Sequence, residues 1–571
     1  MHVGDRLADR LIGYGIRRVF GCPGGQTLPL YDAIAKRRGR IDHVLMRDER
    51  SAAYAADAYA RATGTVGVCD ATVGPGASNL VSGLVEARAA SVPVLAIVSD
   101  IPRHWEHRRH LGSASQGYEQ RRFLEPCVRW YGRVETPDNL AEVLHACIRT
   151  ATSGRPGPVV LEIPADVFYG PAGADGFAPS PGWARVPRLR PGLDPAAIEE
   201  AAARLRACKT PMIIAGGGAL RAGAGPDVQA LAEALRCPVA TTVTGKGIVA
   251  ETHRLSVGVA GSFGVPMANA LLAESDCVVF IGSKAGQTVT LGWTVPHPDV
   301  PVVHIDLDAD EIGRNYRRSI GVVADAQVGA RRLAAALRDG PVASTWNPER
   351  IAELRLEWWD GPVRYKTAPA PGVLKPQDVV RAIGAGTSED DAMVTDASLA
   401  SGWAASRWQV KVAGRCFFAP RGLAGLGWGL PAAIGVAAAR RDTERRGRVV
   451  CLAGDGGWAY SMAEVEPAAR LALPIVAVVL NNSSLAWIDH VAAGRFPEAR
   501  VSDRFLDVDF AAAARALGAT VERVDTLDRF EAAFRAAAAD STSRPWVIEA
   551  VTCDAETPVQ QPPPGTPKTG Y

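Results

Sequence analysis

The stretch RVVCLAGDGGWAYSMAEVEPAARLALPIVAVVLNN, residues 448–482, decides the fold of the C-terminal part of the chain. The apolar run 449–453 predicts a buried strand. The sequence GDGG at 454–457 predicts a turn in which backbone N–H groups can approach an anion, because glycine has no Cβ. A helix over about 462–473 and a second buried strand over 475–480 complete a predicted βαβ unit.

The crossover of such a unit brings the carboxyl ends of both strands to the same edge of the sheet. We therefore expect Asp455 and Asn482 to lie close together, although 27 positions separate them. A carboxylate, an amide oxygen and a nearby backbone carbonyl form a hard oxygen site that suits Mg²⁺. A lone GDG after a strand is usually an ordinary turn, so the prediction depends on the whole constellation with a strand at both ends.

GDG, a spacer of this length and a closing NN resemble the thiamine-diphosphate (ThDP) binding motif. Over about residues 2–555 the chain is similar to the acetolactate synthase large-subunit family. The resemblance implies that Asp455 and Asn482 bind Mg²⁺ through their side chains and Ser484 through its backbone carbonyl. It also implies that the cofactor is contacted by Gly454, Asp455, Gly456, Gly457 and Asn482.

Composition places the chain among ordinary soluble globular proteins. It has 571 residues, 47% of them apolar and 22% charged, with a net charge of +2, which gives no reason to expect nucleic-acid or membrane binding. The N-terminus does not read as a signal peptide, and no apolar run is long enough to span a membrane. The 10 cysteines are scattered without a CxxC pair, which predicts free thiols and a cytoplasmic location.

Alternating predicted strands and helices indicate three doubly wound α/β domains. By resemblance these are a pyrimidine-binding domain at 1–170, a central Rossmann-like domain at 193–340 and a diphosphate-binding domain at 373–555. The glycines at 216–218 do not match GxGxxG and are better interpreted as packing turns. The tail 556–571 is rich in proline, so we expect it to be disordered or to cover a site.

The segment VLMRDERSAAYAADAYARATG, residues 44–64, resembles the strand–glutamate–helix segment that carries the catalytic glutamate of the family. The match falls on Glu49. In the family this glutamate exchanges a proton with N1′ of the cofactor's pyrimidine, which lets the 4′-imino group remove the proton from C2 of the thiazolium. Alternatively, Glu49 is an ordinary first-turn glutamate that is favoured by the helix dipole.

Other segments resemble parts of the family's cofactor site. PGG at 23–25, GPGASN at 74–79, the turn at 396–398 and the segment 417–435 all match, and Leu426 falls on the bulky residue that bends the cofactor into a V shape. The implied contacts are Gly24, Gly25, Pro75, Asn79, Ala397, Ser398 and Leu426.

The sequence departs from the family pattern at four places. Residues 280–290 read FIGSKAGQTVT, without the arginine and aspartates of flavin-binding members, so FAD is doubtful. Ser115-Gln116 stands where the family has Phe-Gln, which keeps Gln116 as a catalytic candidate but removes an aromatic wall. Gln26 replaces an alanine, and the segment that follows the NN differs as well.

The segment RHWEHRRH, residues 103–110, is unusual. Related decarboxylases place a histidine pair near this position for proton transfer, which makes His110 a candidate. A solvated basic loop is the simpler interpretation. The arginines of the segment could also meet an anionic substrate.

The resemblance implies decarboxylation of a 2-oxo acid that depends on ThDP and Mg²⁺, followed by carboligation to a second carbonyl compound. Simple decarboxylation to an aldehyde is the alternative, and a non-catalytic paralogue is less favoured because Glu49, Asp455 and Asn482 are all present. A Rossmann dehydrogenase is disfavoured by the missing fingerprint. In the family each site lies between two subunits, so we expect a homodimer or homotetramer.

Overall fold

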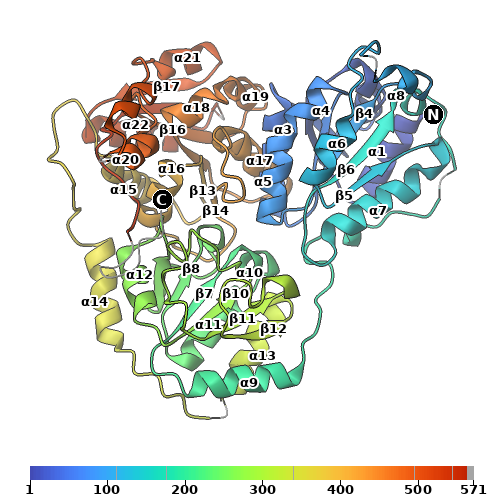
Figure 1. The fold of residues 1–571 in the computed structure, drawn as a ribbon. Coiled ribbons are helices and arrows are strands. Elements are labelled where there is room, and N and C mark those ends of the chain that lie inside the picture. The colour runs from blue at the N-terminus through green and yellow to red at the C-terminus, as the bar shows by residue number, and fades with distance from the viewer. Residues whose placement is uncertain (111, 175, 339, 494, 543, 562–571) are drawn as a thin grey trace.

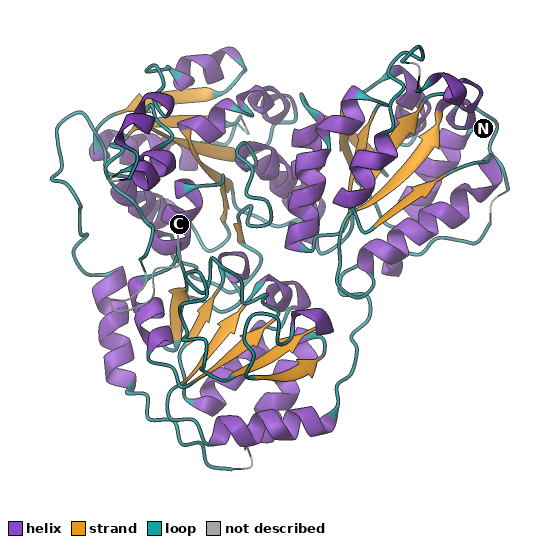
Figure 2. Cartoon of the chain, viewed as in Figure 1, coloured by secondary structure: helices purple, strands orange, loops and turns teal. Residues whose placement is uncertain are grey.

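A computed structural model describes residues 1–561 except 111, 175, 339, 494 and 543. Within these residues the chain forms three parallel sheets of six strands, each flanked by helices (Figures 1 and 2). The predicted fold class is therefore confirmed. Strands with β-branched and apolar residues on both faces are expected when helices cover both sides of a parallel sheet.

The N-terminal sheet has the strand order β2-β1-β3-β4-β6-β5. Its strands are β1 (Arg18–Gly21), β2 (Asp42–Leu45), β3 (Gly67–Ala71), β4 (Val94–Asp100), β5 (Trp130–Arg133) and β6 (Val159–Pro164). Its helices are α1 (Val3–Gly13), α2 (Leu28–Ala35), α3 (Glu49–Thr63), α4 (Pro75–Asn79), α5 (Val81–Ala90), α6 (Gln120–Leu124), α7 (Leu140–Thr152) and α8 (Ala165–Phe168).

The central sheet has the order β12-β11-β10-β7-β8-β9. Its strands are β7 (Pro211–Ala215), β8 (Val239–Thr241), β9 (Ser256–Val259), β10 (Cys277–Ile281), β11 (Val302–Asp306) and β12 (Ser319–Val323). The helices are α9 (Pro195–Arg206), α10 (Gly217–Ala222), α11 (Gly225–Leu235), α12 (Pro266–Ala273), α13 (Ala326–Arg338) and, in the following tether, α14 (Pro348–Trp359).

The C-terminal sheet has the order β14-β13-β15-β16-β18-β17. Its strands are β13 (Ala392–Thr395), β14 (Phe417–Phe418), β15 (Val449–Gly454), β16 (Ile475–Asn481), β17 (Thr520–Val524) and β18 (Trp546–Val551). The helices are α15 (Pro376–Gly386), α16 (Leu399–Arg407), α17 (Gly429–Asp442), α18 (Asp455–Ala459), α19 (Val465–Arg470), α20 (Ala486–Ala492), α21 (Phe510–Ala516) and α22 (Leu527–Ala539).

The decisive βαβ unit forms with one difference. β15 and β16 pair in parallel from Val449↔Ile475 to Gly454↔Leu480, as expected. The prediction of a turn at 454–457 followed by one helix over 462–473 is wrong in detail. The helix α18 begins directly at Asp455, and the connection continues through a short 3₁₀ turn at Met462–Glu464 into α19.

The N- and C-terminal domains of one chain pack directly against each other through α3 and α17, while the central domain lies beside both (Figure 1). The contact between the two helices is close. A Cβ on Gly435 of α17 would lie 2.2 Å from the carbonyl oxygen of Ala55 in α3. A glycine and an alanine-rich helix face therefore set the distance between the two domains.

The described part of the C-terminal tail is packed. The carboxylate of Glu556 is 4% exposed and accepts hydrogen bonds from the backbone of Lys366 and Thr367 and from the side chains of Lys375 and Gln377. The tail therefore ties the third domain to the preceding tether. Residues 562–571 lie outside the described part. Among the described residues, none of the helices combines the length and the apolar composition that a membrane span requires.

Candidate functional site

The C-terminal ends of β15 and β16 bring Asp455 and Asn482 together. Asp455 Oδ2 accepts hydrogen bonds from the backbone N–H of Asn482 at 3.1 Å and of Ser484 at 3.2 Å. Asn482 Oδ1 accepts from the backbone N–H and the hydroxyl of Ser484, both at 3.1 Å. Ser483 between them has φ +53°, a left-handed conformation that turns the backbone back toward Asp455. The predicted residues thus form one compact cluster.

This cluster has the donor set of a Mg²⁺ site. Asp455 is 4% exposed, and burial raises the pKa of its carboxyl group, against the lowering effect of N–H groups that include those of Gly456 and Asn482. A bound cation would compensate this buried charge. Nothing would lie within 4 Å of a Cβ on Gly454, so the space in front of the cluster is open. The residues therefore fit a metal that also binds a diphosphate.

Asp396 organises the second part of this half-site. Its buried carboxylate accepts from the backbone N–H of Ala397 at 2.6 Å, of Gly427 at 3.1 Å and of Gly429 at 3.0 Å. Ala397 is 3% exposed, and Ser398 has φ +66° at the start of α16. Leu426 is half-buried in the loop that Asp396 holds. The turn at 396–398 and the loop of Leu426 therefore share one anchor.

Glu49 is the first residue of α3 in the N-terminal domain. The helix is capped by Asp48, whose carboxylate accepts from the backbone N–H of Arg50 at 2.6 Å. The side chain of Glu49 is half-buried, and Asn79 donates to its Oε2 at 3.0 Å. A Cβ on Gly76 would lie 3.1 Å from Oε1 of Glu49, so the predicted segment around Pro75 borders the same carboxylate.

The remaining predicted residues of the N-terminal domain lie at the same sheet edge. A Cβ on Gly24 would lie 2.2 Å from Oγ1 of Thr72, whereas Gly25 faces open space. Gln116 is exposed with φ +60°, and its side-chain amide oxygen Oε1 accepts from the side-chain amide of Gln26 at 3.4 Å. Thr72 in turn donates to Gln26 at 2.9 Å. Gln26, where the family has alanine, thus connects Gln116 to the end of β3.

The basic segment 103–110 is mostly occupied by structural contacts. Arg103 pairs with Asp166 at 2.8 Å, and Arg109 pairs with the buried Asp100 at 2.7 Å. His110 is 69% exposed, with its Nδ1 3.4 Å from a carboxylate oxygen of Glu119. Arg103 and Arg109 are therefore not available for an anionic substrate in this arrangement.

Within one chain, Glu49 and the Asp455 cluster form two separate half-sites. Among the described residues, no hydrogen bond or ion pair joins Glu49 to this cluster. The start of α3 instead meets other parts of the C-terminal domain. The backbone N–H of Arg47 donates to Glu464 at 3.1 Å, and Arg50 donates to the carbonyl oxygen of Tyr460 at 3.0 Å.

A separate cavity of about 370 Å³ lies where the three domains meet, at the carboxyl ends of the central strands. Its wall includes Gly217, Gly218, Lys284 and Arg221. The N–H of Gly218 donates to the carbonyl oxygen of Gly282 at 3.0 Å, so these glycines pack closely as expected, but they form the start of α10 and not a turn. The cavity wall between 282 and 289 carries neither an arginine nor a carboxylate, so this segment departs from the flavin-binding pattern, while Arg155, Asp306 and Glu311 from other segments do line the cavity.

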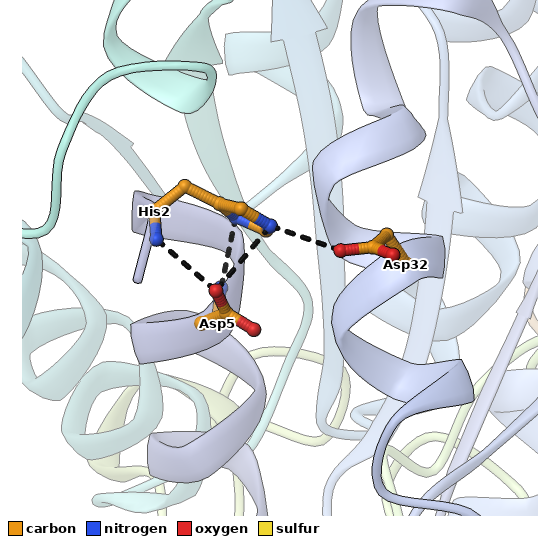
Figure 3. A group of neighbouring side chains, drawn as sticks. All are labelled: His2, Asp5 and Asp32. Carbon is orange, nitrogen blue, oxygen red and sulfur yellow. Dashed lines mark hydrogen bonds and ion pairs between the residues drawn. The ribbon is translucent and has the colours of Figure 1, made fainter.

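One further group resembles a metal site. His2, Asp5 and Asp32 lie within reach of one ion (Figure 3). His2 and Asp5 form the cap of α1, and the ammonium group of Lys36 pairs with Asp32. The group is therefore explained as a helix cap with surface ion pairs.

Comparison with known proteins defines the class. Three family models match the chain: the thiamine pyrophosphate enzyme N-terminal TPP binding domain at 1–121, the central domain at 198–333 and the C-terminal TPP binding domain at 396–550. A thiamin diphosphate-dependent enzyme from Mycobacterium smegmatis, described as putative, has the same fold, with a TM-score of 0.79 and 23% identity over 97% of this chain and 99% of its own.

Curated relatives of the chain identify its family within the thiamine pyrophosphate enzymes. The probable acetolactate synthase large subunit of Methanocaldococcus jannaschii is 32% identical over 99% of this chain and 94% of its own length. The acetolactate synthase large subunit of Parasynechococcus marenigrum is 33% identical over 98% and 89%. The chain therefore belongs to the acetolactate synthase large-subunit-like family of ThDP-dependent enzymes.

Proposed function

We propose that the chain catalyses decarboxylation of a 2-oxo acid that depends on ThDP and Mg²⁺, followed by carboligation to a second carbonyl compound. The observation that carries this proposal is the cluster of Asp455, Asn482 and Ser484 in a chain related over its full length to acetolactate synthases. The free thiols suit a reducing compartment, and we place the enzyme in the cytoplasm. FAD has no part in the proposal.

Each protein group has a defined task. Asp455, Asn482 and the carbonyl of Ser484 would hold Mg²⁺ against the diphosphate, together with the glycines at 454, 456 and 457. Gly24, Gly25 and Pro75 would line the pyrimidine, and Leu426 would fix the bent conformation. When bound, ThDP supplies the carbanion that adds to the ketone carbon and allows CO₂ to leave.

Glu49 moves the proton that makes this chemistry possible. Its carboxyl group would exchange a proton with N1′ of the pyrimidine, and the hydrogen bond from Asn79 orients it. Gln116 lies on the same sheet edge, where its free amide N–H groups could donate to an oxygen of the substrate. Because Glu49 does not contact the Asp455 cluster of its own chain, we propose sites between two subunits, in a homodimer or homotetramer.

A specific observation keeps the decarboxylase alternative. Ser115 is exposed where the family has the phenylalanine of the Phe-Gln pair, which leaves room for water beside the reacting carbon. His110 would then be the proton donor of choice. A non-catalytic role is the least favoured alternative because the metal cluster and the Glu49–Asn79 pair are both intact.

Product analysis tests the proposal. The purified protein is incubated with ThDP, Mg²⁺ and pyruvate, then with larger 2-oxo acids, while CO₂ and organic products are followed together. A 2-hydroxy ketone or acetolactate-type product with one CO₂ per coupling supports the proposal. A free aldehyde supports the alternative, and bound ThDP without turnover on any 2-oxo acid contradicts both.

A further inference from the structure

Glu86 of α5 makes an unusual contact across the domain boundary. Its side chain is fully buried in the N-terminal domain, yet its carboxylate accepts three consecutive backbone N–H groups of the C-terminal domain. The distances are 2.9 Å from Gly422 to Oε1, and 2.6 Å from Leu423 and 3.0 Å from Ala424 to Oε2. Hydrogen bonds to an ionised acceptor are about twice as strong as neutral ones. One side chain therefore fixes the start of the loop that carries Leu426.

The charge of Glu86 is compensated. Arg61 of α3 donates to its Oε1 at 2.9 Å and also to the carbonyl oxygen of Ala419 at 2.8 Å. Burial acts to raise the pKa of Glu86, but Arg61 and the N–H groups of Ala424 and Gly422 bring it below its ordinary value. The ionised form that accepts all three bonds is therefore favoured.

The loop needs such support. Ala424 has φ +61°, a conformation that is unfavourable for a residue with a Cβ. A Cβ on Gly422 would lie 2.4 Å from the carbonyl oxygen of Glu86, and one on Gly425 would lie 2.7 Å from the hydroxyl of Tyr54. The loop thus lies directly on α5 and α3 of the N-terminal domain.

Two carboxylates hold the two ends of this loop. Glu86 holds residues 422–424, and Asp396 holds Gly427 and Gly429. Leu426 lies between the two anchors. Asp396 belongs to the same domain as the loop, whereas Glu86 belongs to the domain that carries Glu49 and Asn79.

We propose that Glu86 is a positioning residue that holds Leu426 in place against the cofactor. This inference rests on the proposed function. In a dimer whose sites lie between subunits, α4 ends at Asn79, which binds Glu49 of one site, and α5 follows with Glu86, which holds the loop of the other site. The segment 75–90 therefore connects the two sites mechanically.

The test compares Glu86→Gln with Asp442→Asn. Asp442 also joins the two domains, through Arg18 at 2.7 Å and Tyr59 at 2.9 Å, but at the far end of α17. ThDP affinity is measured by titration in the presence of Mg²⁺, and C2–H exchange of bound ThDP by NMR. We expect Glu86→Gln to weaken binding or slow exchange about tenfold, and Asp442→Asn to leave both within about twofold. If Glu86→Gln does not fold, Glu86→Asp replaces it in the same comparison, because this variant keeps the charge but has a shorter side chain.

A double-mutant cycle separates positioning from general stability. In a Leu426→Ala background, Glu86→Gln should change ThDP affinity and C2–H exchange by less than about twofold, because the side chain that Glu86 positions is already gone. An equal effect in both backgrounds, or unchanged binding and exchange in Glu86→Gln, would overturn the inference while leaving the proposed function intact. A wild-type protein that does not bind ThDP would overturn the proposed function and this inference with it.

Discussion

The backbone N–H of Asn482 donates directly to Oδ2 of Asp455 at 3.1 Å, across 27 positions of sequence. This bond joins the ends of β15 and β16, and the N–H of Ser484 donates to the same oxygen. The carboxylate is therefore oriented by backbone groups of its own domain. A site that is pre-organised in this way loses little freedom when a metal enters.

Replacement of Asp455 should abolish ThDP binding that depends on Mg²⁺. Asp455→Ala removes the only carboxylate of the cluster, so we expect the affinity to fall by at least about 100-fold, as for a lost charged ligand in a buried site. Titration of ThDP with and without Mg²⁺ measures the effect. Asp391→Asn is the control, because Asp391 is also buried but accepts from Ser388 and Arg448 at the opposite edge of the sheet. Tight binding by Asp455→Ala would exclude the metal role.

Replacement of Glu49 should separate binding from activation. In Glu49→Gln the side chain keeps its size but cannot exchange a proton with N1′, so ThDP binds while C2–H exchange slows by about two to four orders of magnitude. Exchange of the C2 proton for deuterium, followed by NMR, measures this. Asp48→Asn is the neighbouring control, since asparagine caps a helix as well as aspartate does. A normal exchange rate in Glu49→Gln would remove Glu49 from its assigned role.

Replacement of His110 distinguishes the two reactions. His110 is 69% exposed and 3.4 Å from Glu119. If the product is an aldehyde that needs a protein proton donor, His110→Asn should lower kcat about 10- to 1,000-fold with little change in ThDP binding. If the enzyme is a carboligase, the rate should stay within about twofold. His297→Asn provides the control, because His297 is also an exposed histidine near a carboxylate, that of Asp299.

Stability should depend on pH through Asp57, which is fully buried between α3 and α17. Burial raises the pKa of Asp57 to about 6, against the effects of Arg61 and of the indole N–H of Trp428. Because this pKa exceeds the value of about 4 in the unfolded chain, the folded protein binds the proton more tightly. The stabilisation from Asp57 is therefore present at low pH and is lost as the pH rises from about 4 to about 6.

Melting temperatures of wild type and Asp57→Asn measure this dependence. As the pH rises from about 4 to about 6, the melting temperature of the wild type should fall relative to that of Asp57→Asn, and above about pH 6 the difference should stay constant. Glu556→Gln should show the opposite dependence on pH, with the wild type losing its advantage as the pH falls. Burial acts to raise the pKa of Glu556, but the N–H groups of Lys366 and Thr367 and the ammonium group of Lys375 bring it down to about 2, so its contribution is lost as the pH falls below about 4.5. A flat difference for Asp57→Asn would contradict the assignment.

Local pattern is enough to predict the strands of the site, but not the start of the helix after Gly454 or the distant residues that support the site. For β11 (Val302–Asp306), α3 (Glu49–Thr63) and β18 (Trp546–Val551), the sequence pattern predicts the same bounds as the structure has. The helix after Gly454 starts earlier than predicted. Glycines such as Gly456 and Gly457 have low helix propensity, so the sequence does not indicate a helix there, although an acidic residue such as Asp455 is favourable in the first turn of a helix.

The supports were missed because they act over long sequence distances. Glu86 lies 338 positions from Ala424, and Arg47 lies 417 positions from Glu464. In the sequence Glu86 is simply one polar residue on a helix, and no local signal indicates which groups its carboxylate contacts. Only packing of the N- and C-terminal domains reveals its partners. A glutamate in an otherwise small and apolar helix face, VSGLVEARAA, was the one available hint.

Complementation between two inactive variants tests where the sites lie. If each site takes Glu49 from one chain and Asp455 from another, a mixed dimer of Glu49→Gln and Asp455→Ala chains has one intact site and one site with both changes. Random mixing of subunits should then restore about a quarter of wild-type activity, because about half of the dimers are mixed and one of two sites in each is intact. Sites within single chains would give no recovery, since every chain then carries one defect. The variants are denatured and refolded together, with each refolded alone as the control. Recovery near a quarter supports sites between subunits, and activity no higher than that of the separate variants contradicts them.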